Sequence, residues 1–254
     1  MAKIFRKIRQ ELLSKKKFSR YLLYAVGEIV LVVIGILIAL AINNKNQRSI
    51  ESKNEQTYLI GLQKEFEMSK LKLDELISVN QQSYQGAKQL LVYISSPEEL
   101  SNEVEFSKLL YTTFASDIAF NPNNSLLHEM INSGGLKNIS NTKLRIELTN
   151  WVSTLDDISK QEQELGIQRE LVLNMFRTDR YNLQTILKHV GVYSELGLPK
   201  SDSTYSNLAL LRAPEFENNI LLFLLACHAT EQAHYVPLME DLNTILMLIS
   251  EELD

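Results

Sequence analysis

The sequence has 254 residues, of which 45% are hydrophobic, and its nine Gly and five Pro are too few for a sandwich or barrel built on tight turns. The formal net charge is −5, but residues 1–20 carry eight basic side chains against Glu11 alone, a net +7 that leaves −12 for residues 21–254. This acidic remainder excludes a broad nucleic-acid-binding face, and the single cysteine, Cys227, excludes an intrachain disulfide.

The N-terminal part of the chain has the pattern of a membrane anchor. Residues 3–13 gather their apolar side chains near one helical face with basic residues around it, which is typical of a helix on anionic lipid. Residues 21–42 are apolar except for one acid and can cross a hydrocarbon core of about 30 Å as a helix. Basic residues precede this span and mostly uncharged ones follow it, so the positive-inside rule places the N-terminus in the cytoplasm. A signal peptide cleaved after Ala39-Leu40-Ala41 is the alternative, and the length of the apolar run and of the leader disfavours it.

One acid, Glu28, lies inside the predicted span, too deep for its short side chain to reach water easily. On a helical wheel it shares a face with Tyr24 and with the close-packing pair Gly35-x-x-x-Ala39. This stripe predicts a helix–helix interface in which Glu28 is protonated or hydrogen-bonded. The alternatives are that Glu28 handles protons or ions, and that it has no special role.

After the span, a seven-residue repeat predicts a long helix with one apolar seam. The two columns of the seam are Leu59, Phe66, Leu73, Asn80, Ala87, Ile94 and Leu62, Ser69, Leu76, Ser83, Leu90. Polar residues interrupt both columns, which disfavours a tight parallel coiled coil. We therefore expect much of this helix to pack within its own chain as a bundle helix, with a stalk as an option for its membrane-near part.

Start and stop signals divide the next part of the chain. Ser96 followed by Pro97 predicts the start of a helix that runs to about Phe114. Residues 120–125 break the chain, and residues 126–132 are expected to form a short helix. The glycines of Ser133-Gly134-Gly135 are expected to stop that helix with a left-handed cap.

The C-terminal part is predicted to contain two long helices separated by a loop. Asn141 is placed to cap the first, and the turn formers of residues 191–206 predict a surface loop followed by a short helix. The final helix is expected to begin at Pro214. Its apolar run at residues 220–227 is too short to span a bilayer and is expected to lie in the core. Pro237 is expected to kink or break this final helix.

The sequence contains one weak candidate for a metal site. His228, Glu231 and His234 recur every three residues, but they spread over so wide an arc of a helix that they need ligands from a second helix to hold one ion. The sequence lacks the motifs of a phosphate loop, a nucleophile elbow, a zinc protease or a dinucleotide fold. We therefore predict no cofactor and no enzymatic activity.

The segment YLLYAVGEIVLVVIGILIALAINNKNQ resembles the opening of an uncharacterised family of Bacteroidota single-pass membrane proteins with a G-E-I-V-L-V-x-x-G-I-L-I-A-L signature and paired asparagines. In this chain the signature includes Gly27, Glu28, Gly35 and Ala39, with the pair at Asn43-Asn44. The later pattern S-G-x-L-x-x-I-x-N-x-x-L-R at residues 133–145 is also similar. The resemblance implies the topology given above and a Gram-negative inner membrane, and it implies no activity.

The expected fold class is all-α, with a basic cytoplasmic tail (residues 1–20), one transmembrane helix (21–42) and a periplasmic helical bundle (43–254). We expect a membrane-anchored scaffold or interaction protein that contacts membrane lipid and pairs with copies of itself or with another membrane protein. Self-association would use the face of Tyr24, Glu28, Gly35 and Ala39. Two alternatives remain, a subunit of an ion-driven inner-membrane complex that uses Glu28, and a periplasmic domain that senses a small ligand.

Overall fold

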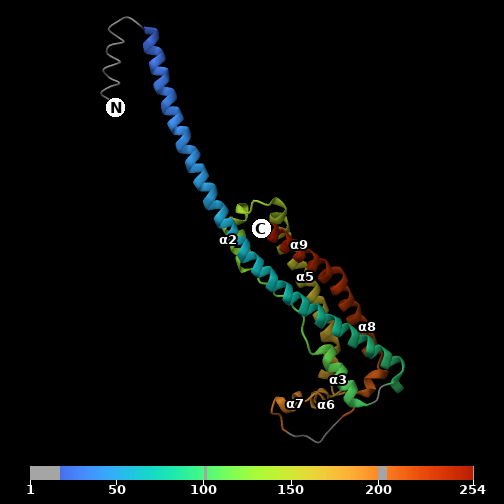
Figure 1. Ribbon diagram of the computed structural model, residues 1–254. Helices are drawn as coiled ribbons and strands as arrows, with labels where there is room; N and C mark the ends of the chain where they lie inside the picture. Colours follow the sequence, from blue (N-terminus) through green and yellow to red (C-terminus); the bar gives the residue numbers. More distant parts are fainter. Residues whose placement is uncertain (1–17, 100–101, 200–204, 254) are drawn as a thin grey trace. The chain divides into compact units, whose positions relative to one another are not determined.

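The computed structural model describes residues 18–99, 102–199 and 205–253, and across these residues it contains helices and no strand (Figure 1). The predicted all-α fold is confirmed. The chain divides into two compact units, residues 1–57 and 58–254, and the long helix α2 (Phe18–Ser95) contributes to both. The interfacial helix predicted at residues 3–13 lies outside the described residues, and the division at residues 20 and 42 stays a prediction.

The described part of the first unit is the N-terminal portion of α2. No side chain from Leu22 to Ile42 is buried, and large apolar ones are widely open, with Leu23 76% and Leu31 74% exposed. Among the described residues, this is one helix long and apolar enough to cross a membrane. The segment is compatible with a membrane anchor, because a bilayer would cover the apolar surface that the chain leaves open.

The second unit is a bundle built on the remainder of α2. In this part of α2 the buried side chains on the two predicted columns are Leu59, Leu62, Phe66, Ser69, Leu73, Asn80, Ser83, Ala87 and Leu90, and Tyr93 is buried beside them. Leu76 and Ile94 are half-buried. The prediction that this helix packs within its own chain through one seam is confirmed.

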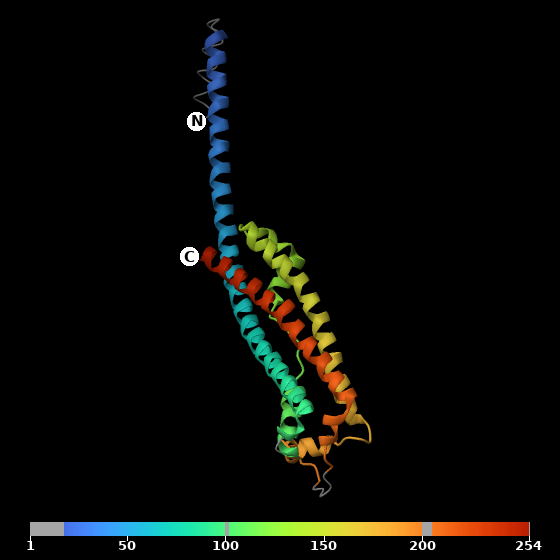
Figure 2. The same ribbon diagram turned by 90° about the vertical axis from the view of Figure 1, so that its right-hand side faces the viewer.

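Seven α-helices, one π-helical turn and four short 3-10 turns follow α2 in the described residues. They are η1 (Pro97–Glu99), α3 (Glu103–Phe114), α4 (Ser125–Ser133), η2 (Gly135–Asn138), α5 (Thr142–Asn174), η3 (Met175–Arg177), α6 (Leu183–His189), α7 (Val192–Glu195), η4 (Leu208–Arg212), α8 (Pro214–Ala229), the π turn η5 (Thr230–Tyr235) and α9 (Val236–Leu253). Figures 1 and 2 show α5, α8, α9 and the second part of α2 running alongside one another, with α3 and α6 together near one end.

Local capping explains several helix boundaries. Asn141 begins α5 as predicted, because its side chain accepts a hydrogen bond from the Leu144 N–H at 3.0 Å. Gly134 ends α4 as predicted, with the left-handed φ of 71° that glycine adopts without strain. The helical turn predicted to follow Ser96 is present as η1, and α3 ends at Phe114 as predicted. The α-helix itself begins later than predicted, at Glu103, where the Asn102 side chain accepts from the Glu105 N–H at 3.0 Å.

One prediction about the C-terminal half needs correction, and another is made more specific. The expected loop at residues 191–206 contains the short helix α7, which starts where Gly191 turns the chain with a φ of 85°. The kink or break expected at Pro237 takes the form of the π turn η5, which ends at Tyr235 and separates α8 from α9. A proline lacks the N–H of an α-helical bond and its ring clashes with the carbonyl four residues earlier, and a wider turn accommodates both effects.

Two helical glycines give a matched pair of stability predictions. A Cβ on Gly86 would clash with the Thr113 hydroxyl of α3, which is held on a stiff β-branched side chain by a 2.7 Å bond to the Leu109 carbonyl. Gly86→Ala is expected to destabilise the fold by about 1 kcal/mol, because overpacking outweighs the gain in helix propensity. Gly166→Ala in α5 meets nothing within 4 Å and is expected to stabilise it by about 0.5–1 kcal/mol. Urea unfolding followed by circular dichroism measures both, and shifts of the same sign would contradict the close approach at Gly86.

Candidate functional site

The predicted transmembrane face lies on the exposed first part of α2. Tyr24, Glu28, Gly35 and Ala39 all belong to one unbroken helix, so their helical spacing keeps them on one side. A Cβ placed on Gly35 would meet no other atom within 4 Å. The chain itself covers none of this face near Gly35, and a neighbouring helix would find room there.

The three weak metal candidates are not brought together around a common point. Among the described residues, no group of three His, Cys, Asp or Glu side chains could hold a metal ion. His228 stacks on Tyr84 of α2 at 6.1 Å between ring centroids, and the Glu231 carboxylate accepts from Gln81 Nε2 at 2.8 Å. Both side chains tie α2 to the end of α8 and the start of η5.

A buried amide, Asn80, continues this link between helices. Its Nδ2 donates to the Cys227 carbonyl at 3.0 Å and to a Glu231 carboxylate oxygen at 3.3 Å. A polar side chain in an apolar seam fixes the register of the helices that share it, so the interruption of the heptad column at Asn80 marks a specific contact. Burial raises the pKa of the Cys227 thiol to about 12, which leaves it neutral near pH 7 and unreactive as a nucleophile.

A second buried polar cluster was not predicted from the sequence. Glu162 of α5 is 8% exposed, and its carboxylate accepts from the Tyr235 hydroxyl at 2.5 Å and from the Phe120 N–H at 2.9 Å and 3.0 Å to its two oxygens. Burial raises the pKa of the Glu162 carboxyl, and the hydrogen bonds from Tyr235 and Phe120 partly oppose that rise. In the sequence, Glu162 falls between Ile158 and Leu165 in the apolar stripe of its helix. An acid at such a position is the sequence feature that could have indicated a buried polar cluster.

The Glu162 cluster joins three segments that are distant in the sequence. It connects α5 to the irregular chain before α4 through Phe120, and to the π turn η5 through Tyr235. Burial also raises the pKa of the Tyr235 hydroxyl, which therefore stays protonated and keeps donating. The Glu162 carboxylate, the Tyr235 hydroxyl and the Phe120 N–H bond to one another in the interior, which supports a structural role.

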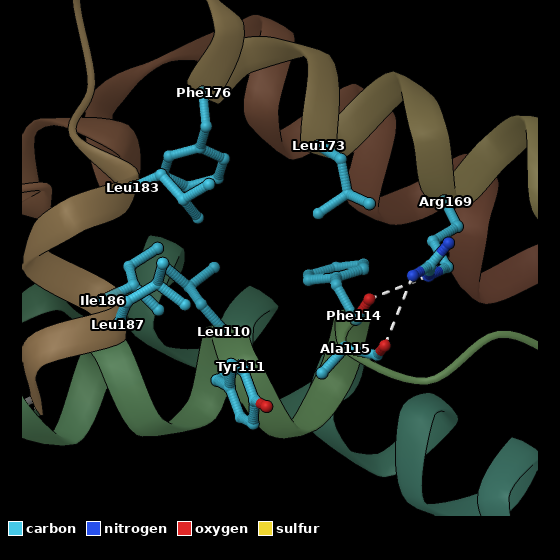
Figure 3. A pocket seen from close by; sticks show the side chains of 10 residues that line it. All are labelled: Leu110, Tyr111, Phe114, Ala115, Arg169, Leu173, Phe176, Leu183, Ile186 and Leu187. Carbon is cyan, nitrogen blue, oxygen red and sulfur yellow. Dashed lines mark hydrogen bonds between the residues drawn. The ribbon is translucent and has the colours of Figure 1, made fainter. Parts of the chain in front are cut away.

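An apolar cavity of about 160 Å³ lies among α3, α5, η3 and α6 (Figure 3). Its wall is formed mainly by Leu110, Phe114, Leu173, Phe176, Ile186 and Leu187. Leu110, Phe114 and Ile186 are buried, whereas Leu183 at the edge is 46% exposed. The cavity therefore has a buried floor and an apolar rim that reaches the surface.

Arg169 stands at one end of this cavity and donates hydrogen bonds to two backbone carbonyls. Its Nε donates to the Phe114 carbonyl at 2.8 Å and its Nη2 to the Ala115 carbonyl at 3.4 Å, as the dashed lines in Figure 3 show. Its Nη1 lies 4.0 Å from Asp117 Oδ1 and 3.8 Å from Glu170 Oε1. The guanidinium thus satisfies the carbonyls at the C-terminal end of α3, where a cation is favoured.

The sequence pattern of a family of unknown function (DUF6090) matches residues 28–171, which is more than half of the chain. The chain belongs to this family. Neither a curated protein nor a solved structure matches it. The DUF6090 region begins at Glu28 and ends within α5, so it includes Gly35, Ala39, Glu162 and Arg169 and leaves α6, α8 and α9 outside. The Bacteroidota source implied by the resemblance stays a prediction.

Proposed function

We propose that this DUF6090 protein is a single-pass inner-membrane protein whose periplasmic helical domain is an interaction scaffold. Its N-terminus lies in the cytoplasm, and copies associate through the face of Tyr24, Glu28, Gly35 and Ala39. The observation that carries the proposal is the exposure of an apolar stretch of α2 that continues into a folded bundle. Lipid covers such a stretch, and helix pairing in lipid favours small residues that let backbones approach.

The association is tested with matched leucine substitutions in the intact protein, purified in mild detergent. Ala39→Leu and Gly35→Leu add bulk to the proposed face, whereas Ala41→Leu adds the same bulk about 160° away from Ala39 around the helix. We expect the wild type and Ala41→Leu to have the mass of a multimer, and Ala39→Leu and Gly35→Leu to shift toward the monomer. Identical masses for all four proteins would refute the proposed face.

The orientation has its own measurement. Ser153 is exposed on α5, so Ser153→Cys is expected to react with a membrane-impermeant maleimide once the outer membrane is permeabilised. Ala2→Cys is expected to react only after the inner membrane is lysed. The native Cys227 is buried and supplies a low background. Labelling of Ala2→Cys before lysis would contradict a cytoplasmic N-terminus.

A second function, a subunit of an ion-driven complex, is favoured by the position of Glu28 within the apolar segment. Intramembrane carboxylates serve both as interhelical hydrogen-bonding groups and as proton carriers. Glu28→Gln keeps the hydrogen-bonding capacity and removes the titration. A variant that keeps the multimer mass but abolishes proton flux through a co-purified multi-span partner would support this second function, whereas dissociation in Glu28→Gln would assign the carboxylate to assembly.

A further inference from the structure

We propose that the apolar cavity among α3, α5 and α6 binds a small uncharged apolar molecule of about the size of one aromatic ring. Neither membership of the family nor the anchoring role assigns a ligand to this place. The proposal goes beyond the scaffold function and does not depend on self-association.

The size and lining of the cavity define this class of ligand. A cavity of about 160 Å³ is close to the roughly 150 Å³ at which a space lined by Leu, Ile and Phe stays dry and accepts benzene. The lining carries two polar side chains, Tyr111 and Arg169, and its other members are Leu, Ile, Phe and Ala. Water at the buried floor of this space would find few of the two to four polar partners that it needs.

The charge at the cavity excludes an anion as the preferred ligand. Arg169 is the one charged residue of the lining, and its hydrogen bonds go to the carbonyls of Phe114 and Ala115. Asp117 and Glu170 lie 4.0 Å and 3.8 Å from its Nη1 and lower the positive potential there, while Glu170 also accepts from Arg177 Nη2 at 3.1 Å. A carboxylate in the cavity would therefore compete with two acids for a guanidinium already held in place, while a neutral molecule would not.

The way into the cavity is apolar as well. Leu183 is 46% exposed and Ala115 is exposed, and both line the cavity at the protein surface. In Figure 3 the side chains of Phe176 and Leu183 lie at the end opposite Arg169. A bound molecule would cover exposed apolar surface of the rim as well as the buried floor, which favours binding through the hydrophobic effect.

The test uses fluorobenzene as the probe and the intact protein in lipid nanodiscs, with empty nanodiscs as the blank for partition into lipid. Ala115→Leu fills the cavity from α3, and Leu173→Phe fills it from α5. Ala229→Leu is the matched control, because Ala229 is exposed on α8 and does not line the cavity. Circular dichroism verifies that each variant keeps its helical content.

We expect a bound fluorine NMR signal with wild type that empty nanodiscs lack. The dissociation constant should rise at least about tenfold in Ala115→Leu and Leu173→Phe and stay unchanged in Ala229→Leu. Hexanol should displace fluorobenzene at a lower concentration than hexanoate does. The proposal is overturned if no bound signal exists, or if both filling variants bind like wild type. Stronger displacement by hexanoate would overturn the assignment of an uncharged ligand.

Discussion

Trp151→Ala is expected to destabilise the helical unit by about 3–5 kcal/mol, the range for a fully buried large aromatic residue. Trp151 is 1% exposed, and its ring packs against Phe66 of α2 at 5.2 Å and Phe120 at 6.2 Å between centroids. Its Nε1 donates to the buried Asn124 side chain at 3.1 Å, directly before α4. Trp151 therefore joins α5, α2 and the start of α4. The cavity left by Trp151→Ala could close only if these elements moved together.

Urea unfolding of the intact protein in detergent, followed by far-ultraviolet circular dichroism, measures this loss. Tryptophan fluorescence cannot serve, because Trp151 is the sole tryptophan. Trp151→Phe keeps most of the packing and removes the N–H, so its expected loss is about 1–3 kcal/mol, the cost of leaving the Asn124 oxygen without its donor. If Trp151→Ala cost no more than Trp151→Phe, packing of the indole ring would not be the main contribution.

Helices whose boundaries depend on nearby residues could be predicted from the sequence. The seven-residue columns of α2 identified its buried face because side chains seven apart return to the same side of a helix. Asn141 and Gly134 marked the boundaries of α5 and α4 because a cap bonds to backbone within a few residues of itself. The apolar span was equally readable, since length and composition alone define it.

Features that depend on distant contacts could not be predicted in this way. Pro97–Glu99 form only a 3-10 turn, and the α-helix begins at Glu103, whose carboxylate accepts from the Asn207 N–H at 3.0 Å, a partner far away in the sequence. The π turn before Pro237 ends at Tyr235, which bonds to Glu162 of another helix. Periodicity describes one helix at a time and carries no information about such partners.

The same distinction applies to the sites. The stripe through Glu28 is a property of one helix, so the sequence could propose it, and its role as an interface stays a prediction. The cavity is bounded mainly by apolar side chains from α3, α5, η3 and α6, and the helical pattern of one element does not show that these side chains meet around a space. Only their assembly leaves a space near Arg169.

Glu162→Ala is expected to destabilise the unit by about 2–5 kcal/mol, because it leaves two buried donors without an acceptor. These are the Phe120 N–H and the Tyr235 hydroxyl, which is fully buried. Tyr235→Phe removes one donor and the hydrogen bond but leaves the carboxylate its bond from Phe120, so its expected cost is smaller. Equal stability of Glu162→Ala and wild type in urea unfolding would show that the cluster contributes nothing net.

The raised pKa of Glu162 also fixes the sign of a pH effect. Between the ordinary value of 4.5 and the higher value in the fold, the folded chain binds more protons at Glu162 than the unfolded chain does. The contribution of this carboxyl is therefore fully present below pH 4.5 and is lost as the pH rises through the folded pKa. The free energy of unfolding of wild type relative to Glu162→Gln should fall across that window and level off above it.

Asp241 requires control in the same measurement, since burial and the charges of Glu147 and Glu240 raise its pKa as well. Its contribution has the same sign and would overlap that of Glu162 in the wild-type curve. The comparison is therefore made between Asp241→Asn and the double variant Asp241→Asn/Glu162→Gln, so that Asp241 titrates in neither protein. A difference in unfolding free energy between these two proteins that rises with pH, or does not change, would contradict a carboxyl whose charged form is penalised by burial. A falling difference would show that the hydrogen bonds from Tyr235 and Phe120 only partly offset the cost of burying this charge.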